Sequence, residues 1–306
     1  MLFVINAGSN TLSMFESSWE DPTNLTLLGK LVATGGKSPV SVAVSLELGT
    51  VCVGHSAGTG GVSCAGFDWK RGLGTFDVIR PFTLNQSDPP IGPLNGLAQV
   101  LFTADSNELI AVVKGNGTVT KPSYFKTYSV DWKTRKVSHH GRIIDKGKTG
   151  IAFVVALIPN TEKLLVSTVS FGATIVDIDN LGVPVAITNI TDQAATCWAT
   201  VSDFTGTGFV DDVIVPQLTE VDLSTGVILK ELPIDSDGQG LIDLKAVGTK
   251  VYALSPGSGI RPAALLVFDI SGGPGTVRQI QKFIVDKTTQ DLEGIGIFPN
   301  PGIAAG

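Results

Sequence analysis

Short apolar stretches separated by turn residues recur along the whole chain and predict strands. The stretches are rich in Val, Ile, Leu and Ala, and the turns between them contain Asn, Asp or Gly. Short apolar runs bounded by such residues are typical of buried strands. Helix-favouring Lys, Glu, Arg and Met are scarce, so long amphipathic helices are not expected. The pattern predicts an all-β protein.

One unit recurs six times: an apolar strand, a turn and a second apolar strand. The paired strands are expected at 41–45 with 51–54, 96–102 with 109–113, 150–155 with 164–167, 196–201 with 212–215, and 241–246 with 251–254. A third strand follows at 174–179, 218–223 and 265–270. The sixth unit is split between 292–300 and 2–5.

The spacing of these units predicts a β-propeller. Six units in 306 residues give about 51 residues each, enough for four short strands. We expect one domain over 1–306 with six blades, seven being the alternative. The C-terminal strand is expected to close the ring by joining the N-terminal blade, which removes an exposed sheet edge.

Composition narrows the possible partners. Hydrophobic residues make up 43% of the chain and charged residues 16%, which excludes a disordered protein. The net charge of −6 argues against nucleic acid, and no apolar run is long enough for a membrane span. Loops rich in Pro and Gly at 37–39, 89–93 and 255–262 suit a small apolar substrate. A homodimer is left open.

Cysteines and glycosylation motifs indicate the secretory pathway. Cys52 and Cys64 flank a Gly-rich turn, so a disulfide between facing strands is expected. Cys197, in an apolar segment, is interpreted as a buried thiol. Four Asn-x-Ser/Thr motifs are candidate glycosylation sites, at Asn24, Asn85, Asn116 and Asn189. The chain opens directly on a strand, so a leader is expected to have been removed.

Candidate catalytic residues follow from positions within the repeat. His55, after an inner strand, is a candidate general acid or base, although a hydrogen-bonded loop histidine is the alternative. Lys114 follows the second strand of its unit, Arg261 lies in the loop after the strand at 251–255, and Lys148 precedes the strand that starts near Ile151. Placed by their positions in the repeat, these cations could converge and bind a carboxylate, phenolate or enolate. For any one of them, an ordinary solvated cation is the default interpretation.

Further side chains are candidates for the walls of a substrate site. Trp198 sits within a predicted inner strand, where it lines an axial cavity or packs in the core. Phe171 and Gln217 occupy one turn position in their respective units. We expect these three side chains to contact substrate together with Lys148.

The stretch Leu2-Phe-Val-Ile-Asn-Ala-Gly-Ser-Asn-Thr-Leu-Ser-Met-Phe resembles the repeat of the lactonase-type propellers. That group includes 6-phosphogluconolactonase and the fungal proteins known as 3-carboxymuconate cyclases. The expected glycosylation and disulfide resemble its fungal branch. That branch is in turn similar to cofactor-free fungal hetero-Diels–Alderases.

A second resemblance concerns the six-bladed gluconolactonase (SMP-30) propellers, which hold a divalent metal on the axis. Glu293-Gly294 and Asn95-Gly96 stand at matching strand starts, and Asp243 is a candidate third ligand. This resemblance implies a Ca²⁺ or other divalent site. The Glu-Gly-Pro form of that family is absent here, because Ile295 follows Gly294.

Three functions are carried forward. The first is a cofactor-independent enzyme that cyclises or dehydrates a small apolar phenolic or terpenoid substrate, in its most specific form a hetero-Diels–Alderase acting through a quinone methide. The second is a lactone hydrolase or muconate-lactonising enzyme, with or without a metal. The third is a secreted binding protein without catalysis.

Overall fold

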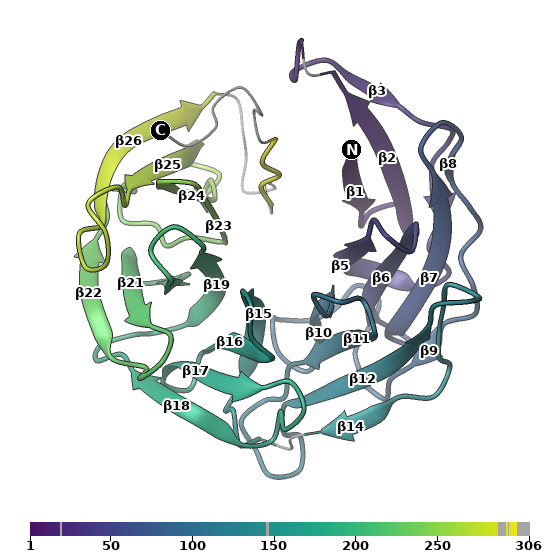
Figure 1. Ribbon diagram of the computed structural model, residues 1–306, viewed down its shortest axis with the longest axis horizontal. Coiled ribbons are helices and arrows are strands. Elements are labelled where there is room, and N and C mark those ends of the chain that lie inside the picture. The colour runs from purple at the N-terminus through teal and green to yellow at the C-terminus, as the bar shows by residue number, and fades with distance from the viewer. Residues whose placement is uncertain (19, 145–146, 287–291, 293, 299–306) are drawn as a thin grey trace. The chain divides into compact units, whose positions relative to one another are not determined.

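The computed structural model describes residues 1–18, 20–144, 147–286, 292 and 294–298. Among them no helix occurs, and 26 strands form six antiparallel sheets. The fold is a six-bladed β-propeller, as the repeat predicts (Figure 1). The chain divides into two compact units, 1–147 and 148–306, and each unit contributes three blades. The expectation of a single domain over 1–306 stays a prediction.

The first unit contains blades 1 to 3. Blade 1 consists of β1 (Leu2–Asn6), β2 (Thr11–Ser17), β3 (Leu25–Leu27) and β4 (Val32–Ala33). Blade 2 consists of β5 (Lys37–Ser45), β6 (Thr50–Ala57), β7 (Gly61–Asp68), β8 (Gly72–Leu73) and β9 (Arg80–Pro81). Blade 3 consists of β10 (Leu97–Phe102), β11 (Glu108–Val113), β12 (Tyr124–Asp131), β13 (Lys136–Val137) and β14 (Arg142–Ile144).

The second unit contains blades 4 to 6. Blade 4 consists of β15 (Ala152–Ile158), β16 (Lys163–Thr168), β17 (Gly172–Asp177) and β18 (Pro184–Asn189). Blade 5 consists of β19 (Thr196–Ser202), β20 (Thr207–Asp212), β21 (Gln217–Asp222) and β22 (Ile228–Pro233). Blade 6 consists of β23 (Asp243–Val247), β24 (Lys250–Ser255), β25 (Ala263–Asp269) and β26 (Arg278–Val285).

Within each unit the core lies between neighbouring blades. The first strands of successive blades contact one another, β5 with β1 and β10, and β19 with β15 and β23. One apolar cluster joins blades 2 and 3 through Cys52, Leu97 and Leu109. Another joins blades 5 and 6 through Phe209 and Leu244. Second strands are buried on both faces, which is why they read as continuous apolar runs rather than as an alternation.

One predicted strand is misplaced. The second strand of blade 5 was expected at 212–215, whereas β20 covers Thr207–Asp212. The carboxylate of Asp212 accepts backbone N–H groups from Ile214 and Val215, and from Ala194 and Ala195 on the facing loop. These bonds turn the chain immediately after Asp212 and so end the strand there.

Ring closure by the predicted strand 292–300 lies largely outside the described residues. The described residues 292 and 294–298 belong to no strand. The strands of blade 1 in the described part of the chain all come from residues 2–33. Closure of the ring therefore stays a prediction.

Candidate functional site

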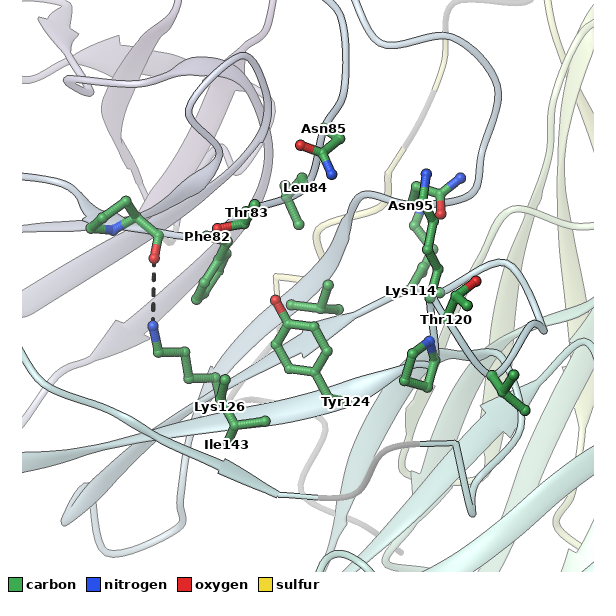
Figure 2. A pocket seen from close by; sticks show the side chains of 16 residues that line it. Phe82, Thr83, Leu84, Asn85, Asn95, Lys114, Thr120, Tyr124, Lys126 and Ile143 are labelled. Atoms are coloured by element: carbon green, nitrogen blue, oxygen red, sulfur yellow. Dashed lines mark hydrogen bonds between the residues drawn. The ribbon is translucent and has the colours of Figure 1, made fainter.

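A pocket of about 580 Å³ opens in the first unit, where blade 2 leads into blade 3. Its sides are two loops, one after β9 at 82–95 and one between β11 and β12 at 114–122. Tyr124 and Lys126 of β12 and Ile143 of β14 also line it (Figure 2). We call it the lysine pocket, because all three charged residues among its described lining are lysines: Lys114, Lys121 and Lys126.

Backbone pairing beyond the strand ends sets the position of two lining side chains. The Lys114 N–H donates to the Gly96 carbonyl at 2.8 Å, and the Asn95 N–H donates to the Gly115 carbonyl at 3.2 Å. Gly115 is required because a Cβ there would lie 2.2 Å from the Lys121 carbonyl oxygen. The 114–122 loop therefore folds back tightly and presents its side chains to the pocket.

Lys126 is held by contacts of its own. Its Nζ donates to the Pro81 carbonyl at 3.5 Å and lies 4.8 Å from the centre of the Phe82 ring and 5.4 Å from that of Tyr128. Partial burial lowers the pKa of Lys126 below its usual value. In Figure 2, Lys126 and Lys114 lie on opposite sides of Tyr124. Burial raises the pKa of Tyr124, so its hydroxyl stays protonated and can donate a hydrogen bond.

The rest of the lining mixes amides, hydroxyls and apolar groups. Asn85, Asn95, Thr83 and Thr120 provide neutral polar groups, while Phe82, Leu84 and Pro122 provide apolar wall. None of the described lining residues is acidic, and neither Lys121 nor Lys126 is in an ion pair with a described residue. This combination is suited to a small organic anion.

The sequence-predicted catalytic residues are only partly brought to this pocket. Lys114 lines it, and so does Asn95, one of the candidate metal ligands. His55 instead lies within β6, fully buried, and not in an open turn. Its Nδ1 is 3.3 Å from the Gly61 carbonyl, and a Cβ on Gly36 would lie 2.4 Å from the ring. A general acid or base role for His55 stays a prediction, and its burial does not favour it.

The remaining predicted residues lie in the second unit. Arg261 is exposed in the β24–β25 loop, where its Nη1 donates to the Asp237 carbonyl. Lys148 is exposed ahead of β15, and Phe171 lies half-buried in the β16–β17 turn. Trp198 packs against the apolar cluster of blades 5 and 6, in keeping with the core alternative. Gln217 begins β21, and its Nε2 is 3.3 Å from both Thr219 Oγ1 and Glu231 Oε1.

The predicted metal set is not assembled among the described residues. Glu293 lies outside them, and Asp243 accepts N–H groups from Leu244 and Ile295. Within the described ranges, no group of three or more His, Cys, Asp or Glu side chains is arranged to hold a metal ion. A divalent cofactor stays an untested alternative to the cofactor-free prediction.

The predicted disulfide is confirmed: Cys52 of β6 faces Cys64 of β7, and the two are bridged. Cys197 is buried and is not in a disulfide. Asn24, Asn85 and Asn189 are exposed and Asn116 is half-buried, but glycosylation itself stays a prediction. A disulfide is compatible with an extracellular or periplasmic protein. No helix suited to crossing a bilayer occurs among the described residues.

Sequence reasoning missed Lys121, Lys126 and Asn85 as neighbours of Lys114. Part of this arrangement could have been predicted for Lys126. Alternate residues of a strand lie on the same face, so a strand at 124–131 puts Tyr124 and Lys126 side by side. Which loop of blade 2 would face them was not readable from the pattern. A buried acid at Asp211 was also missed, although Asp211-Asp212 interrupts the otherwise apolar run 209–215.

Comparison with known proteins supports the fold alone. No family model and no curated protein sequence matches this chain. A periplasmic gluconolactonase from Pseudomonas aeruginosa is 12% identical with a TM-score of 0.69, over 94% of this chain and 83% of that one. A proposed 6-phosphogluconolactonase from Bacteroides fragilis is 12% identical with a TM-score of 0.68, over 94% and 82%. A structure of a nidogen/laminin complex also matches, at 9% identity and a TM-score of 0.61, over 94% of both chains.

Proposed function

We propose that this protein is a lactone hydrolase whose substrate carries a negative charge and binds in the lysine pocket. The observation that carries the proposal is the charge of that pocket: its described charged residues are all lysines, in a chain with a net charge of −6. A local concentration of positive charge on an acidic protein attracts and orients an anion. The lactonase-type structural neighbours favour a lactone as the reacting group.

The size and lining of the pocket agree with a small-molecule ligand. A volume of about 580 Å³ falls within the range of roughly 300–1,000 Å³ that is typical of such sites. Lys114 and Lys121 stand in the loop that forms one side, and Lys126 stands on β12. A carboxylate or phosphate on the substrate would contact the loop lysines while the ring carbonyl lies nearer β12.

The chemistry of lactone opening can be assigned to side chains of this pocket. Water adds to the ring carbonyl, and the negative charge that develops on its oxygen is stabilised by N–H and O–H donors. The Asn95 amide and the Tyr124 hydroxyl are suited to that task. Lys126 is assigned the role of general base, since partial burial lowers its pKa and increases the share of neutral amine. Lys126 accepts a proton from the attacking water. The acyl C–O bond of the ring then breaks, the ring oxygen takes that proton, and the product is a hydroxy acid.

The cyclisation hypothesis has less support. Catalysis by a hetero-Diels–Alderase was expected to rely on a dry, apolar cavity for an uncharged substrate. The lysine pocket has charged and amide groups on several sides, which would bind solvent or an anion in preference to a terpenoid. Cyclisation, a fungal source and a homodimer all stay predictions.

A binding protein without catalysis is the second candidate. The match to a structure of a nidogen/laminin complex supports this candidate, because that structure is a protein complex. Under that reading the lysine pocket binds an anion and releases it unchanged. The two candidates therefore share the binding step and differ only in turnover.

The test separates binding from turnover. Gluconate and 6-phosphogluconate are titrated into the protein by calorimetry, and hydrolysis of the corresponding lactones is followed by acid release. We expect Lys121→Gln to weaken anion binding about tenfold, the effect of one lost charged hydrogen bond, and Lys126→Gln to impair hydrolysis far more than anion binding. Lys133→Gln, which removes an exposed lysine outside the pocket, should leave binding unchanged.

The outcomes decide between the candidates. Anion binding with lactone hydrolysis that Lys126→Gln abolishes supports the hydrolase. Binding without hydrolysis of either lactone or of a wider lactone set supports the binding protein. If neither anion binds, or if Lys133→Gln weakens binding as much as the pocket variants do, the lysine pocket is not the site.

A further inference from the structure

A second feature, independent of the lysine pocket, is a buried carboxylate in blade 5. Asp211 of β20 is 2% exposed, although the matching residue of blade 3, Val112, is fully buried and apolar. Asp211 pairs with Trp198, and Val112 pairs with Gln99. Each of these two partners directly follows a β-bulge in the first strand of its blade. A carboxyl group in blade 5 therefore occupies a position where blade 3 holds a valine and blade 2 holds Gly54.

Only half of this carboxyl group is satisfied by the described residues. Asp211 Oδ1 accepts the Trp198 N–H at 3.2 Å, whereas Oδ2 is buried and has no hydrogen-bond partner among them. No Lys, Arg or His of the described residues forms an ion pair with Asp211. Burial of an unpaired charge costs several kcal/mol or more, so a compensating positive charge or a proton is required.

Two neighbouring carboxylates, Asp212 and Asp243, make a negative charge on Asp211 still less favourable. Asp212 follows on β20, and Asp243 begins the adjacent β23. Their own partners are backbone N–H groups, with Lys245 Nζ 3.5 Å from Asp243 Oδ1. Burial, with these two acids adding to it, holds the pKa of Asp211 well above its usual range. In the absence of another positive charge the group would be protonated.

Asp211 also lines a cavity of about 10 Å³. The other polar residues around it are Gln193 of the loop before β19, Thr196 of β19, Asp212 of β20, and Gln217 and Thr219 of β21. The Asp212 carboxylate already accepts four backbone N–H groups, so Asp211 is the carboxylate left with an unpaired oxygen. That volume corresponds to about one water molecule or one small ion. Hydroxyl and amide oxygens beside a carboxylate form the oxygen-rich donor set that hard cations prefer.

We infer that this cavity is a binding site for a single monovalent cation of the size of Na⁺, with Asp211 as its charged ligand. One unpaired carboxylate matches one positive charge. The described residues offer no cluster of three or more His, Cys, Asp or Glu ligands, which is the arrangement expected of a divalent site. The bound cation joins β19, β20 and β21 and so stabilises blade 5.

Thermal unfolding tests the inference on the whole chain. The melting temperature is measured at pH 8 in NaCl and in choline chloride of equal ionic strength. We expect Na⁺ to raise the melting temperature of the wild type by about 2 °C or more at saturation. Asp211→Asn should abolish this rise and should be more stable than the wild type in choline. Thr219→Val, which removes one neutral oxygen, should require a higher Na⁺ concentration for the same rise.

Two further comparisons make the result specific. Asp105→Asn, which alters an exposed turn of blade 3, should keep the full response to Na⁺. The response of the wild type should shrink from pH 8 to pH 5, because protons and the cation compete for the same oxygen. The inference is overturned if the wild type melts at the same temperature in both salts, or if Asp211→Asn keeps the response. A response to Ca²⁺ at micromolar concentration with none to Na⁺ would overturn the assignment to a monovalent ion.

Discussion

Arg80 and Asp77 form a two-point ion pair at the edge of blade 2. Nη1 donates to Oδ1 at 3.0 Å and Nη2 to Oδ2 at 2.8 Å, and Arg80 is 1% exposed. The same guanidinium donates to the carbonyls of Val137 at 2.6 Å and Ser138 at 2.7 Å, so it links β9 of blade 2 to β13 of blade 3. Arg80 therefore fixes two neighbouring blades with a planar set of donors.

Replacement of Arg80 by Met is expected to lower the free energy of unfolding by about 3 kcal/mol, since the Val137 and Ser138 carbonyls each lose a donor and Asp77 loses its ion pair. A loss of about 3 kcal/mol is at the low end of what breaking a buried ion pair costs, because the Asp77 side chain is 36% exposed. Urea unfolding measures it. Arg71→Met breaks an ion pair on the surface and should leave the urea midpoint unchanged; an equal loss in both variants would contradict the argument.

Burial of His55 predicts a loss of stability in acid. Burial lowers the pKa of His55 from 6.5 to about 4, so below pH 6.5 the unfolded chain binds a proton that the folded chain does not. This contribution to stability is fully present above pH 6.5 and is lost as the pH falls towards 4, where the loss amounts to about 3 kcal/mol. The free energy of unfolding of His55→Gln should decline less over this interval than that of the wild type. Parallel pH profiles for the two proteins would show that His55 is not the group responsible.

The three cysteines predict a definite thiol count. In native, unreduced protein no thiol should react with a water-soluble reagent, because Cys52 and Cys64 are bridged and Cys197 is buried. In denaturant one thiol should react, and after reduction three. A native count of one would place Cys197 at the surface, and a denatured count of three would mean that no disulfide forms.

Close packing against the His55 ring predicts different effects for two Gly→Ala substitutions. A Cβ on Gly36 would meet three ring atoms within 2.8 Å, so Gly36→Ala should destabilise the protein by about 1–3 kcal/mol. Gly8, in the β1–β2 turn, has no atom within 4 Å of such a Cβ. Gly8→Ala should be neutral or slightly stabilising, because it restricts the unfolded chain. Thermal unfolding of both variants measures the difference, and equal melting temperatures would count against tight packing at Gly36.

The strand pattern was largely readable from the sequence, and the errors have local causes. The paired strands of blades 2, 3, 4 and 6 lie where apolar runs predicted them, as does the Cys52–Cys64 pairing. The second strand of blade 5 was placed too late, since the apolar run 213–215 looks like a strand but follows the turn that Asp212 creates. Hydrogen bonds from one side chain outweighed strand propensity there.

The site was predicted less well than the fold. Lys114 and Asn95 were found because they sit at strand ends, a position fixed by the repeat. Lys121 and Lys126 were missed because their approach to Lys114 depends on how one loop folds back at Gly115. Arg261 and Gln217 occupy predicted positions, but their side chains are hydrogen-bonded within their own unit. Arg261 bonds Asp237, and Gln217 bonds Thr219 and Glu231.

The sequence by itself determined the fold class, the number of blades and the disulfide, because apolar periodicity and turn chemistry are local properties of the chain. Only the tertiary structure decided which polar groups are buried and which face a cavity. His55 and Asp211 both occur in second strands, and packing of neighbouring strands and blades, rather than their own sequence context, removes them from water. Burial depends on residues that are far apart in the chain. The charge states of His55 and Asp211, and the ligands they can bind, could therefore be inferred only from the fold.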